Sequence, residues 1–257
     1  MTQILVIPDP HDDPEENKDR FEWAGRLVVE RQPDYIVCLG DWAEMGSLCR
    51  YDIGMVTAEG RRYCDDIAST HKSLALFNKP IVDYNNKLTH WKKKKYTPKM
   101  VMCIGNHENR INTAAAQTPS LYGTITMDDL KFEEHGWDVY PITKPAIIEN
   151  MAFAHYFTSG VMGRPISGVN HSRSLLIKNF RSSVVGHSHM RGMSEERTIN
   201  GDRILGLVCG CYFDYQMDWT TENDRYWRGM VYLNDVVDGN CEPEFLSLEH
   251  HIKLKYS

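Results

Sequence analysis

The stretch Ile4-Leu5-Val6-Ile7-Pro8-Asp9-Pro10-His11 decides the fold that we expect for this chain. Its four leading residues are all apolar, as in a strand that is buried on both faces of a parallel sheet. Asp9 and His11 follow at alternate positions, so both side chains point the same way where the strand ends. Taken alone, they also fit an ordinary turn. The stretch therefore predicts a central strand with a candidate polar site at its carboxyl end.

A helix and a second strand are expected next. Phe21, Ala24 and Leu27 recur at helical spacing between about residues 15 and 31. The apolar run Tyr35–Leu39 then has the length and composition of another buried strand. A strand, a helix and a strand in this order form a β-α-β unit, in which the two strands lie parallel.

The rest of the chain continues this alternation. Residues 58–95 are expected to form one long helix or a helical hairpin that breaks at Pro80. Short helices and loops are expected over 112–136, and a further helix over 172–180. Strands are expected at 100–104, 139–140, 146–148, 151–154 and 183–185. The runs 204–208, 229–234 and 245–248 are assigned to a second, more antiparallel sheet. This pattern predicts an α/β fold, a four-layer α/β/β/α sandwich of two mixed sheets with a metal site at the carboxyl edge of the strands.

Composition excludes several classes of protein. The 257 residues are 42% hydrophobic and 25% charged, and no Gly/Ser-rich or Pro-rich linker divides them, so one soluble domain is expected. No apolar run approaches the roughly 20 residues that a membrane helix needs. The first residues enter a strand pattern directly, which predicts no signal peptide and a cytoplasmic protein. The net charge of -6 argues against a general nucleic-acid coat protein, although a locally basic groove is compatible with it. Seven cysteines without zinc-binding spacing are expected to be reduced and mostly buried.

Five short polar motifs carry the candidate chemistry, and each follows an apolar run. They are Asp9-Pro10-His11, Gly40-Asp41, Gly105-Asn106-His107-Glu108, His155 and Gly186-His187-Ser188-His189. As metal ligands they offer two carboxylates, one amide and four imidazoles, with one imidazole left over. No motif contains a thiolate, so the set suits a pair of divalent cations bound by oxygen and nitrogen. Two such metals about 3.5–4 Å apart form a clamp for in-line attack on a phosphorus ester.

Each motif has a plain structural alternative. Asp41 also fits the N-cap of a helix, Asn106 a capping residue in a loop, and His155 a buried structural histidine. Together the motifs are more specific, because Asp9, Asp41 and Asn106 each follow a predicted strand. The carboxyl edge that those strands share is where open α/β sheets bind ligands.

The order of these motifs resembles the calcineurin-like metallophosphoesterase superfamily over about residues 4–189, in the style of compact members from bacteria and their phages. The resemblance implies a single metallophosphoesterase domain over 1–257, with a helical insertion at about 58–95. It implies two divalent metal ions, manganese by preference, with iron, zinc, nickel and magnesium as alternatives. The ligands implied for the first metal are Asp9, His11, Asp41 and His189. Those implied for the second are Asp41, Asn106, His155 and His187.

The resemblance also implies a mechanism. A hydroxide that bridges the metals attacks phosphorus, and His107, as an imidazolium, protonates the leaving oxygen. Glu44 occupies the position where the family often has an aspartate three residues beyond the bridging one, so it is the candidate partner of this histidine. Arg110 is a candidate ligand of a phosphate oxygen, and a plain surface arginine is the equal alternative.

Departures from the family pattern bear on the substrate. Residues 40–46 read Gly-Asp-Trp-Ala-Glu-Met-Gly and lack the phosphate-binding arginine of the protein serine/threonine phosphatases. We therefore expect a phosphodiesterase that acts on a nucleotide or a nucleic-acid end, with a phosphomonoesterase as the alternative. A non-catalytic scaffold is the alternative from another class, and the complete ligand set argues against it. The expected partner is a phosphate ester, such as a nucleotide or nucleic acid. No membrane partner is expected, and no oligomeric state is predicted.

Two further features bear on substrate choice. The run Lys92–Lys95 lies between two aromatic residues and fits either a nucleic-acid contact or the solvated end of a helix. Aromatic residues also gather over residues 213–227, where they fit base stacking near the site, core packing or a dimer contact. They are Phe213, Tyr215, Trp219, Tyr226 and Trp227.

Overall fold

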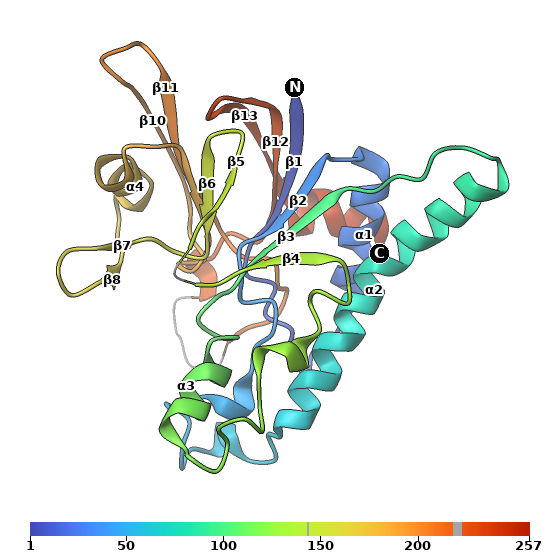
Figure 1. Ribbon diagram of the computed structural model, residues 1–257, viewed down its shortest axis with the longest axis vertical. Helices are drawn as coiled ribbons and strands as arrows, with labels where there is room; N and C mark the ends of the chain where they lie inside the picture. The colour runs from blue at the N-terminus through green and yellow to red at the C-terminus, as the bar shows by residue number, and fades with distance from the viewer. Residues whose placement is uncertain (143, 218–222) are drawn as a thin grey trace.

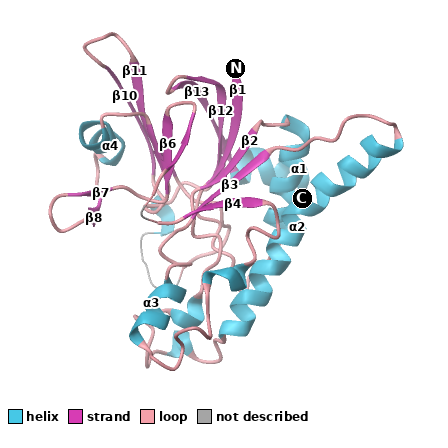
Figure 2. Ribbon diagram, viewed as in Figure 1, coloured by secondary structure: helices cyan, strands magenta, loops and turns pink. Residues whose placement is uncertain are grey.

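The structure, a computed structural model, describes residues 1–142, 144–217 and 223–257. Two mixed sheets pack face to face between helices (Figure 1). Helices α1 (Asp19–Arg31) and α2 (Tyr63–His90) lie against the first sheet, and α4 (His171–Asn179) packs on the second. Figure 2 shows the same layers by secondary structure. This is the four-layer α/β sandwich predicted from the sequence.

The first sheet has the strand order β13-β12-β1-β2-β3-β4. Its members are β1 (Thr2–Ile7), β2 (Tyr35–Cys38), β3 (Lys99–Cys103), β4 (Trp137–Tyr140), β12 (Gly229–Val237) and β13 (Asn240–Ser247). Strands β1 to β4 run parallel, and β12 pairs antiparallel with both β1 and β13. The parallel order follows from the crossover segments between these strands, which include α1 and α2.

The second sheet has the strand order β10-β11-β9-β6-β5. Its members are β5 (Ala146–Ile148), β6 (Met151–Ala154), β9 (Ser183–Val185), β10 (Arg191–Arg197) and β11 (Arg203–Cys209). The neighbours β6, β9 and β11 are parallel, and the outer strands β5 and β10 are antiparallel to them. A separate small hairpin joins β7 (Thr158–Ser159) and β8 (Arg164–Pro165).

The assignment of 229–234 and 245–248 to the second sheet was wrong. These residues form β12 and β13 of the first sheet, where Val231 pairs with Val6 of β1. Both sheets turn apolar residues toward one shared interior, so the alternation of residues within a strand does not reveal which sheet the strand joins. The sequence also gave no signal for β10, because its residues are mostly polar and it lies at the edge of its sheet.

Of the two alternatives for residues 58–95, the single long helix is confirmed, whereas the expected break at Pro80 was wrong, since α2 continues through it. An interior proline removes one hydrogen bond and costs roughly 3 kcal/mol, so packing must offset this cost. Helix α1 supplies that packing at Gly25, where an added Cβ would lie 2.2 Å from the carbonyl oxygen of Phe77 and 3.1 Å from Cδ of Pro80. The turn of α2 that contains Pro80 is therefore covered by close contact with α1.

Shorter helical segments lie in the connections. They are α3 (Arg110–Gln117), α5 (Leu254–Tyr256), η1 (Gly46–Leu48), η2 (Val56–Ala58), η3 (Met127–Leu130), η4 (Asn223–Arg225) and the π-helical η5 (Leu248–Lys253). Within the described residues, no helix is both long enough and apolar enough to cross a membrane.

The continuous apolar run of β1 is explained by two cores. Ile4 and Val6 face the interior between the sheets, whereas Leu5 and Ile7 face the layer of α1 and α2. Successive residues of a strand point to opposite faces, so a strand buried on both sides needs no polar positions. All seven cysteines lie in the described residues and carry free thiols, as predicted.

Candidate metal centre

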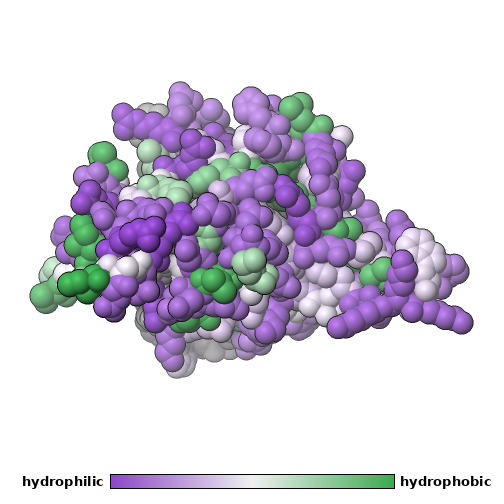
Figure 3. Space-filling view, turned by 90° about the horizontal axis from the view of Figure 1, so that it is seen from above, coloured by the Kyte–Doolittle hydropathy of each residue, from purple (hydrophilic) through white to green (hydrophobic). Residues whose placement is uncertain are grey.

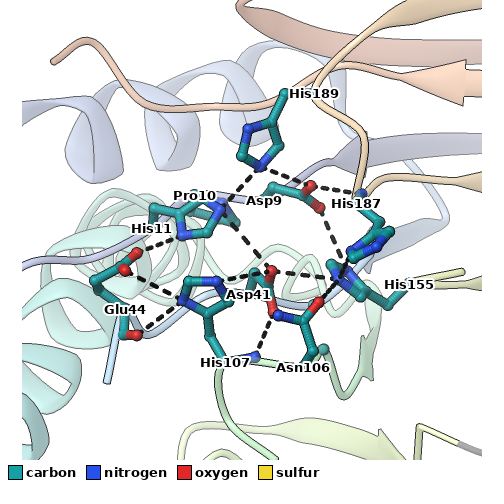
Figure 4. A network of polar contacts seen from close by, with 12 residues as sticks. Asp9, Pro10, His11, Asp41, Glu44, Asn106, His107, His155, His187 and His189 are labelled. Carbon is teal, nitrogen blue, oxygen red and sulfur yellow. Dashed lines mark hydrogen bonds and ion pairs between the residues drawn. The ribbon is translucent and has the colours of Figure 1, made fainter. Parts of the chain in front are cut away.

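The predicted ligands converge where the carboxyl ends of strands from both sheets meet (Figure 4). Asp9, Asp41 and Asn106 follow β1, β2 and β3 of the first sheet. His155 follows β6, and His187 and His189 follow β9, of the second sheet. The site thus joins both sheets, and the fold brings together all seven predicted ligand residues.

One cluster contains Asp9, His11 and His189, whose ligand atoms lie close enough to hold one ion. Nε2 of His11 lies 3.0 Å from Nε2 of His189, and the latter lies 3.4 Å from Oδ2 of Asp9. All three side chains are buried. These atoms therefore form one enclosed nitrogen and oxygen donor set.

A second cluster forms around His155. Its Nε2 atom lies 3.2 Å from Oδ2 of Asp41 and 2.9 Å from Oδ1 of Asn106. Nδ1 of His187 lies 3.1 Å from the same nitrogen. Oδ2 of Asp41 is also 3.9 Å from Nε2 of His11, in the first cluster. Asp41 therefore lies between the clusters, where one carboxylate can serve both.

The donor set fits divalent cations. Oδ1 of Asp9 is buried and has no hydrogen-bond partner among the described residues, and such an atom is costly unless a cation or donor satisfies it. In each cluster two imidazole nitrogens face each other at about hydrogen-bond distance, which is unfavourable between two lone pairs unless a proton or a cation lies between them. Oxygen and imidazole donors without a thiolate suit borderline and hard divalent metals.

The backbone is strained where it presents these ligands. Positive φ angles occur at Asp9 (39°), His11 (46°), Asp41 (50°), His187 (65°) and His189 (56°). Each such non-glycine residue costs on the order of 1 kcal/mol, and such strain is found mainly at functional sites. The surrounding contacts therefore hold the ligand loops in conformations that the residues do not prefer.

Two glycines make room for the carboxylates. A Cβ on Gly105 would lie 2.1 Å from Oδ1 of Asp41, and one on Gly186 would lie 2.1 Å from Oδ1 of Asp9. Adjacent backbone N–H groups orient the same carboxylates: His107 N–H donates to Asp41 at 2.9 Å, and His187 N–H donates to Asp9 at 2.6 Å. The glycines of the G-N-H-E and G-H-S-H motifs are thus needed for close approach.

Burial and neighbouring charges shift the ionisation of the expected ligands in the metal-free site. Burial raises the pKa of Asp9. Although burial opposes ionisation of Asp41, the imidazoles of His155 and His107 hold its pKa well below the usual range. Burial would also lower the pKa of His155, but Asp41 and Asp9 raise it well above its ordinary value. Burial lowers the pKa of His187 to about 4, so this ring is neutral and ready to bind a metal.

His107, the remaining imidazole, contacts Glu44 and Arg110. Its Nδ1 atom lies 3.2 Å from Oε1 of Glu44, and Oε2 of Glu44 lies 2.6 Å from Nδ1 of His11. Burial alone would lower the pKa of His107, but the carboxylates of Glu44 and Asp41 raise it to about 9. Arg110 donates to the carbonyl oxygen of Glu44 at 3.0 Å, and its other terminal nitrogen lies 3.2 Å from Nε2 of His107.

Glu108 has a structural part in the site that the sequence analysis did not assign. Its buried carboxylate accepts hydrogen bonds from the backbone N–H groups of Asp41 (3.0 Å), Ala43 (3.0 Å) and Gly105 (2.9 Å). It therefore ties the loop after β2 to the loop after β3. The sequence signal that could have identified Glu108 is its place as the last residue of the G-N-H-E motif.

Arg20 of α1 holds the loop after β1, and no sequence signal marked it. Its buried guanidinium donates to the carbonyl oxygens of Pro10 and His11, each at 3.0 Å. The hydroxyl of Tyr215 donates to the same His11 oxygen at 2.8 Å. These contacts fix the backbone of the loop that carries the expected ligands Asp9 and His11.

Two residues of the aromatic cluster lie against the candidate metal centre, near the site as one of the alternatives predicted. The ring of Phe213 is 5.3 Å from the rings of both His11 and His189, and the ring of Tyr226 is 4.7 Å from that of His189. Phe213 is buried, so it packs against these imidazoles as part of the core. Trp219 lies outside the described residues.

The run Lys92–Lys95 lies at the opposite edge of the first sheet. It precedes the amino end of β3, whereas Asn106 follows the carboxyl end. The α2–β3 connection projects from the molecule (Figure 1) and presents mainly hydrophilic residues when seen from above, at the right of Figure 3. The four lysines are exposed, so this placement favours the solvated helix end over a contact with a substrate in the site.

Comparison with known proteins finds one family. The sequence profile described as calcineurin-like phosphoesterase matches residues 2–207. No curated protein sequence matches the chain significantly. A conserved uncharacterized protein from Streptococcus pneumoniae, predicted to be a phosphoesterase, has a similar solved structure with 13% identity and a TM-score of 0.37, covering 98% of this chain and 92% of that one. The nuclease MPE of Pseudomonas putida has 13% identity and a TM-score of 0.39, covering 94% of this chain and 87% of its own.

Proposed function

Because this chain belongs to the calcineurin-like phosphoesterase family, a group of metal-dependent phosphoester hydrolases, we propose that it is a phosphodiesterase acting on a nucleotide or a nucleic-acid end. The observation that carries this proposal is the pair of donor clusters with Asp41 between them. Such a pair suits two cations and a phosphate between them. The proposal treats residues 1–257 as a single catalytic domain, with residues 58–95 as its helical insertion.

Each cluster would hold one cation, with Asp41 shared between them. The ligands of the first cation would be Asp9, His11, Asp41 and His189, and those of the second Asp41, Asn106, His155 and His187. When bound, the cations would supply an activated water as nucleophile and would neutralise charge on the phosphoryl oxygens. Manganese is our preferred metal, because mixed carboxylate, amide and imidazole sites take it readily when it is available.

His107 and Arg110 would act on the phosphate together. The carboxylates of Glu44 and Asp41 favour the protonated form of His107, so its Nε2 atom is a donor at neutral pH. Arg110 presents a second donor 3.2 Å from that atom. Two adjacent donors cannot satisfy each other, and an anionic oxygen is their natural common acceptor. His107 would then donate its proton to the leaving oxygen, while Glu44 holds the ring through Nδ1.

The preference for a diester is supported by the small number of cations at the site. Among the described residues, Arg110 is the one whose guanidinium lies beside the His107 ring, and the arginine typical of protein phosphatases is missing from residues 40–46. A phosphodiester carries one negative charge fewer than a monoester, so it needs fewer cations around it. A phosphomonoesterase remains the second candidate.

Paired aryl phosphates test the proposal. Manganese-loaded protein is assayed with bis(p-nitrophenyl) phosphate and with p-nitrophenyl phosphate, and the same assays are run on His107→Ala and Asp41→Asn. The exposed His90 provides the matched control, His90→Ala. We expect diester turnover that both site variants abolish and the control retains. Turnover of the monoester alone would replace the proposal with a phosphatase, and metal binding without any turnover would favour a scaffold.

A further inference from the structure

A cleft of about 700 Å³ opens beside the ligand clusters, and two of the expected ligands, Asn106 and His187, form part of its wall. The rest of the lining comes from α3 and the residues that flank it, from η1 and the segment after it, and from Tyr156 and Pro165. Helix α3 and η1 contact each other, so they enclose the cleft on the side away from the second sheet. A volume of this size holds a ligand of about one nucleotide.

The cleft is positively charged in a protein of net charge -6. Arg50 and Arg110 line it, and no carboxylate of the described residues does so. On the other side of η1, a smaller cavity is lined by five carboxylates and Arg61. Gly46 faces that acidic cavity, whereas Ser47 and Leu48 face the cleft. The part of an anionic substrate that extends beyond the ligand clusters is therefore attracted into this cleft and repelled by the acidic cavity.

Arg50 is a cation of this cleft that is not neutralised by a carboxylate of the described residues. It is exposed, and among the described residues no carboxylate forms an ion pair with it. Its guanidinium donates to the hydroxyl of Tyr51 at 2.8 Å and lies 4.9 Å from the centre of that ring. Arg61, eleven positions later, is instead neutralised by Asp13 at 2.6 Å. Arg50 is therefore available for a phosphate group.

Tyr156 and α3 provide groups that suit a nucleoside. Tyr156 is half-buried and its ring packs 4.9 Å from that of His187, so it places an aromatic surface next to the expected metals. Asn109, Thr113 and Gln117 follow at intervals of four residues and line the same cleft, as one face of a helix does. Amide and hydroxyl groups pair with base edges, and tyrosine rings stack on base faces.

We propose that this cleft is a nucleotide subsite. It binds the base and sugar next to the scissile phosphate against Tyr156 and α3, and Arg50 binds the following phosphate of a short single strand. This inference rests on the proposed function, because it places the scissile phosphate at the two ligand clusters. It makes Arg50 a specificity-determining residue outside the ligand motifs.

Calorimetric binding of two mononucleotides tests the proposal without relying on turnover. Thymidine 3′,5′-bisphosphate has a phosphate on each side of its nucleoside, and thymidine 5′-monophosphate lacks the second one. Both are titrated into manganese-treated His107→Ala protein, which keeps every expected ligand. We expect the bisphosphate to bind roughly tenfold more tightly, as one charge-assisted hydrogen-bonded contact implies. Arg50→Gln on that background should remove the preference.

The matched control is Arg62→Gln, which removes the same charge from an exposed arginine just before α2 that does not line the cleft. It should keep the preference for the bisphosphate. NMR titration should shift the backbone amides of Thr113 and Gln117 when the bisphosphate binds. Equal affinities for the two nucleotides, a preference that survives Arg50→Gln, or binding that leaves α3 unshifted would each overturn the subsite. Failure of diester hydrolysis with an intact preference would instead reject the proposed activity and retain the nucleotide cleft.

Discussion

The carboxylate of Glu44 lies 2.6 Å from Nδ1 of His11, so a residue expected to orient the catalytic histidine also contacts an expected metal ligand. The same carboxylate reaches Nδ1 of His107 at 3.2 Å (Figure 4). The position and protonation of both rings therefore depend on one side chain. Partners that bind the second nitrogen of a metal-binding histidine fix its tautomer and orientation.

Glu44→Gln is therefore expected to impair two properties together. We expect a fall of about 10- to 100-fold in metal affinity, because the amide no longer supports His11 as a carboxylate does. The kcat for the aryl diester should fall at saturating metal as well, since His107 loses the charge that keeps it protonated. Calorimetry with manganese and steady-state kinetics measure the two effects. Glu15→Gln, at an exposed carboxylate, is the control. A change in kcat with unaltered metal affinity would show that the contact between Glu44 and His11 does not contribute to metal binding.

Metal binding should release protons. Asp41 and Asp9 raise the pKa of His155 well above its ordinary value, so this ring is protonated in the metal-free site at neutral pH. A cation can bind Nε2 only after that proton leaves. Below the His155 pKa, affinity for the second metal should therefore rise with pH, by about tenfold per unit for one released proton. Calorimetric titrations with manganese between about pH 6 and pH 8, in two buffers of different ionisation enthalpy, measure the proton count. An affinity that does not change with pH would mean that the ring is already neutral.

Gly186→Ala is expected to damage the first cluster while leaving the fold intact. The new Cβ would lie 2.1 Å from Oδ1 of Asp9, so the carboxylate must move out of its position. We expect loss of about one metal equivalent and of diester turnover, with an unchanged circular dichroism spectrum. Gly192→Ala is the comparison, because its Cβ would meet nothing closer than Ser172 Oγ at 3.3 Å. Full metal content in Gly186→Ala would argue that Asp9 is not a ligand.

Glu108→Ala is expected to affect stability more than any other single change at the site. Three backbone N–H groups donate to its carboxylate, and all of them lose their partner in the variant. Unsatisfied buried donors cost about 1–3 kcal/mol each, although water in the new cavity would recover part of this. Urea denaturation of the metal-free protein should show a loss of at least about 2 kcal/mol. Glu134→Ala, at an exposed carboxylate, should leave the midpoint unchanged. Equal midpoints for the two variants would contradict this role.

The sequence predicted which residues come together at the sheet edge, because their positions depend on local order. Asp9, Asp41 and Asn106 each follow a buried parallel strand, and parallel strands bring their carboxyl ends to one edge. The structure brings these residues together as expected, and their role as ligands stays a prediction, as do the cytoplasmic location and the identity of the metal. The position of Glu44 came from the family resemblance, and its contact with His11 came from the structure alone.

Other features depend on contacts between distant segments, which periodicity does not encode. The sheet that β12 joins is set by its pairing with β1, more than two hundred residues away. The continuity of α2 through Pro80 depends on Gly25 of a different helix. Arg20 has the spacing of a core residue of α1, and only the folded chain shows that it reaches the carbonyl oxygens of the loop after β1.

The pairing of β1 with β12 has a consequence for synthesis of the chain. Strand β1 carries the first ligand loop, yet one of its two edges stays uncovered until residues 229–237 have left the ribosome. Every expected ligand up to His189 is made before that point. During this interval an open apolar strand edge can pair with other nascent chains. Strands β12 and β13 contribute none of the expected ligands, yet β12 covers the open edge of the strand that leads to the first ligand loop.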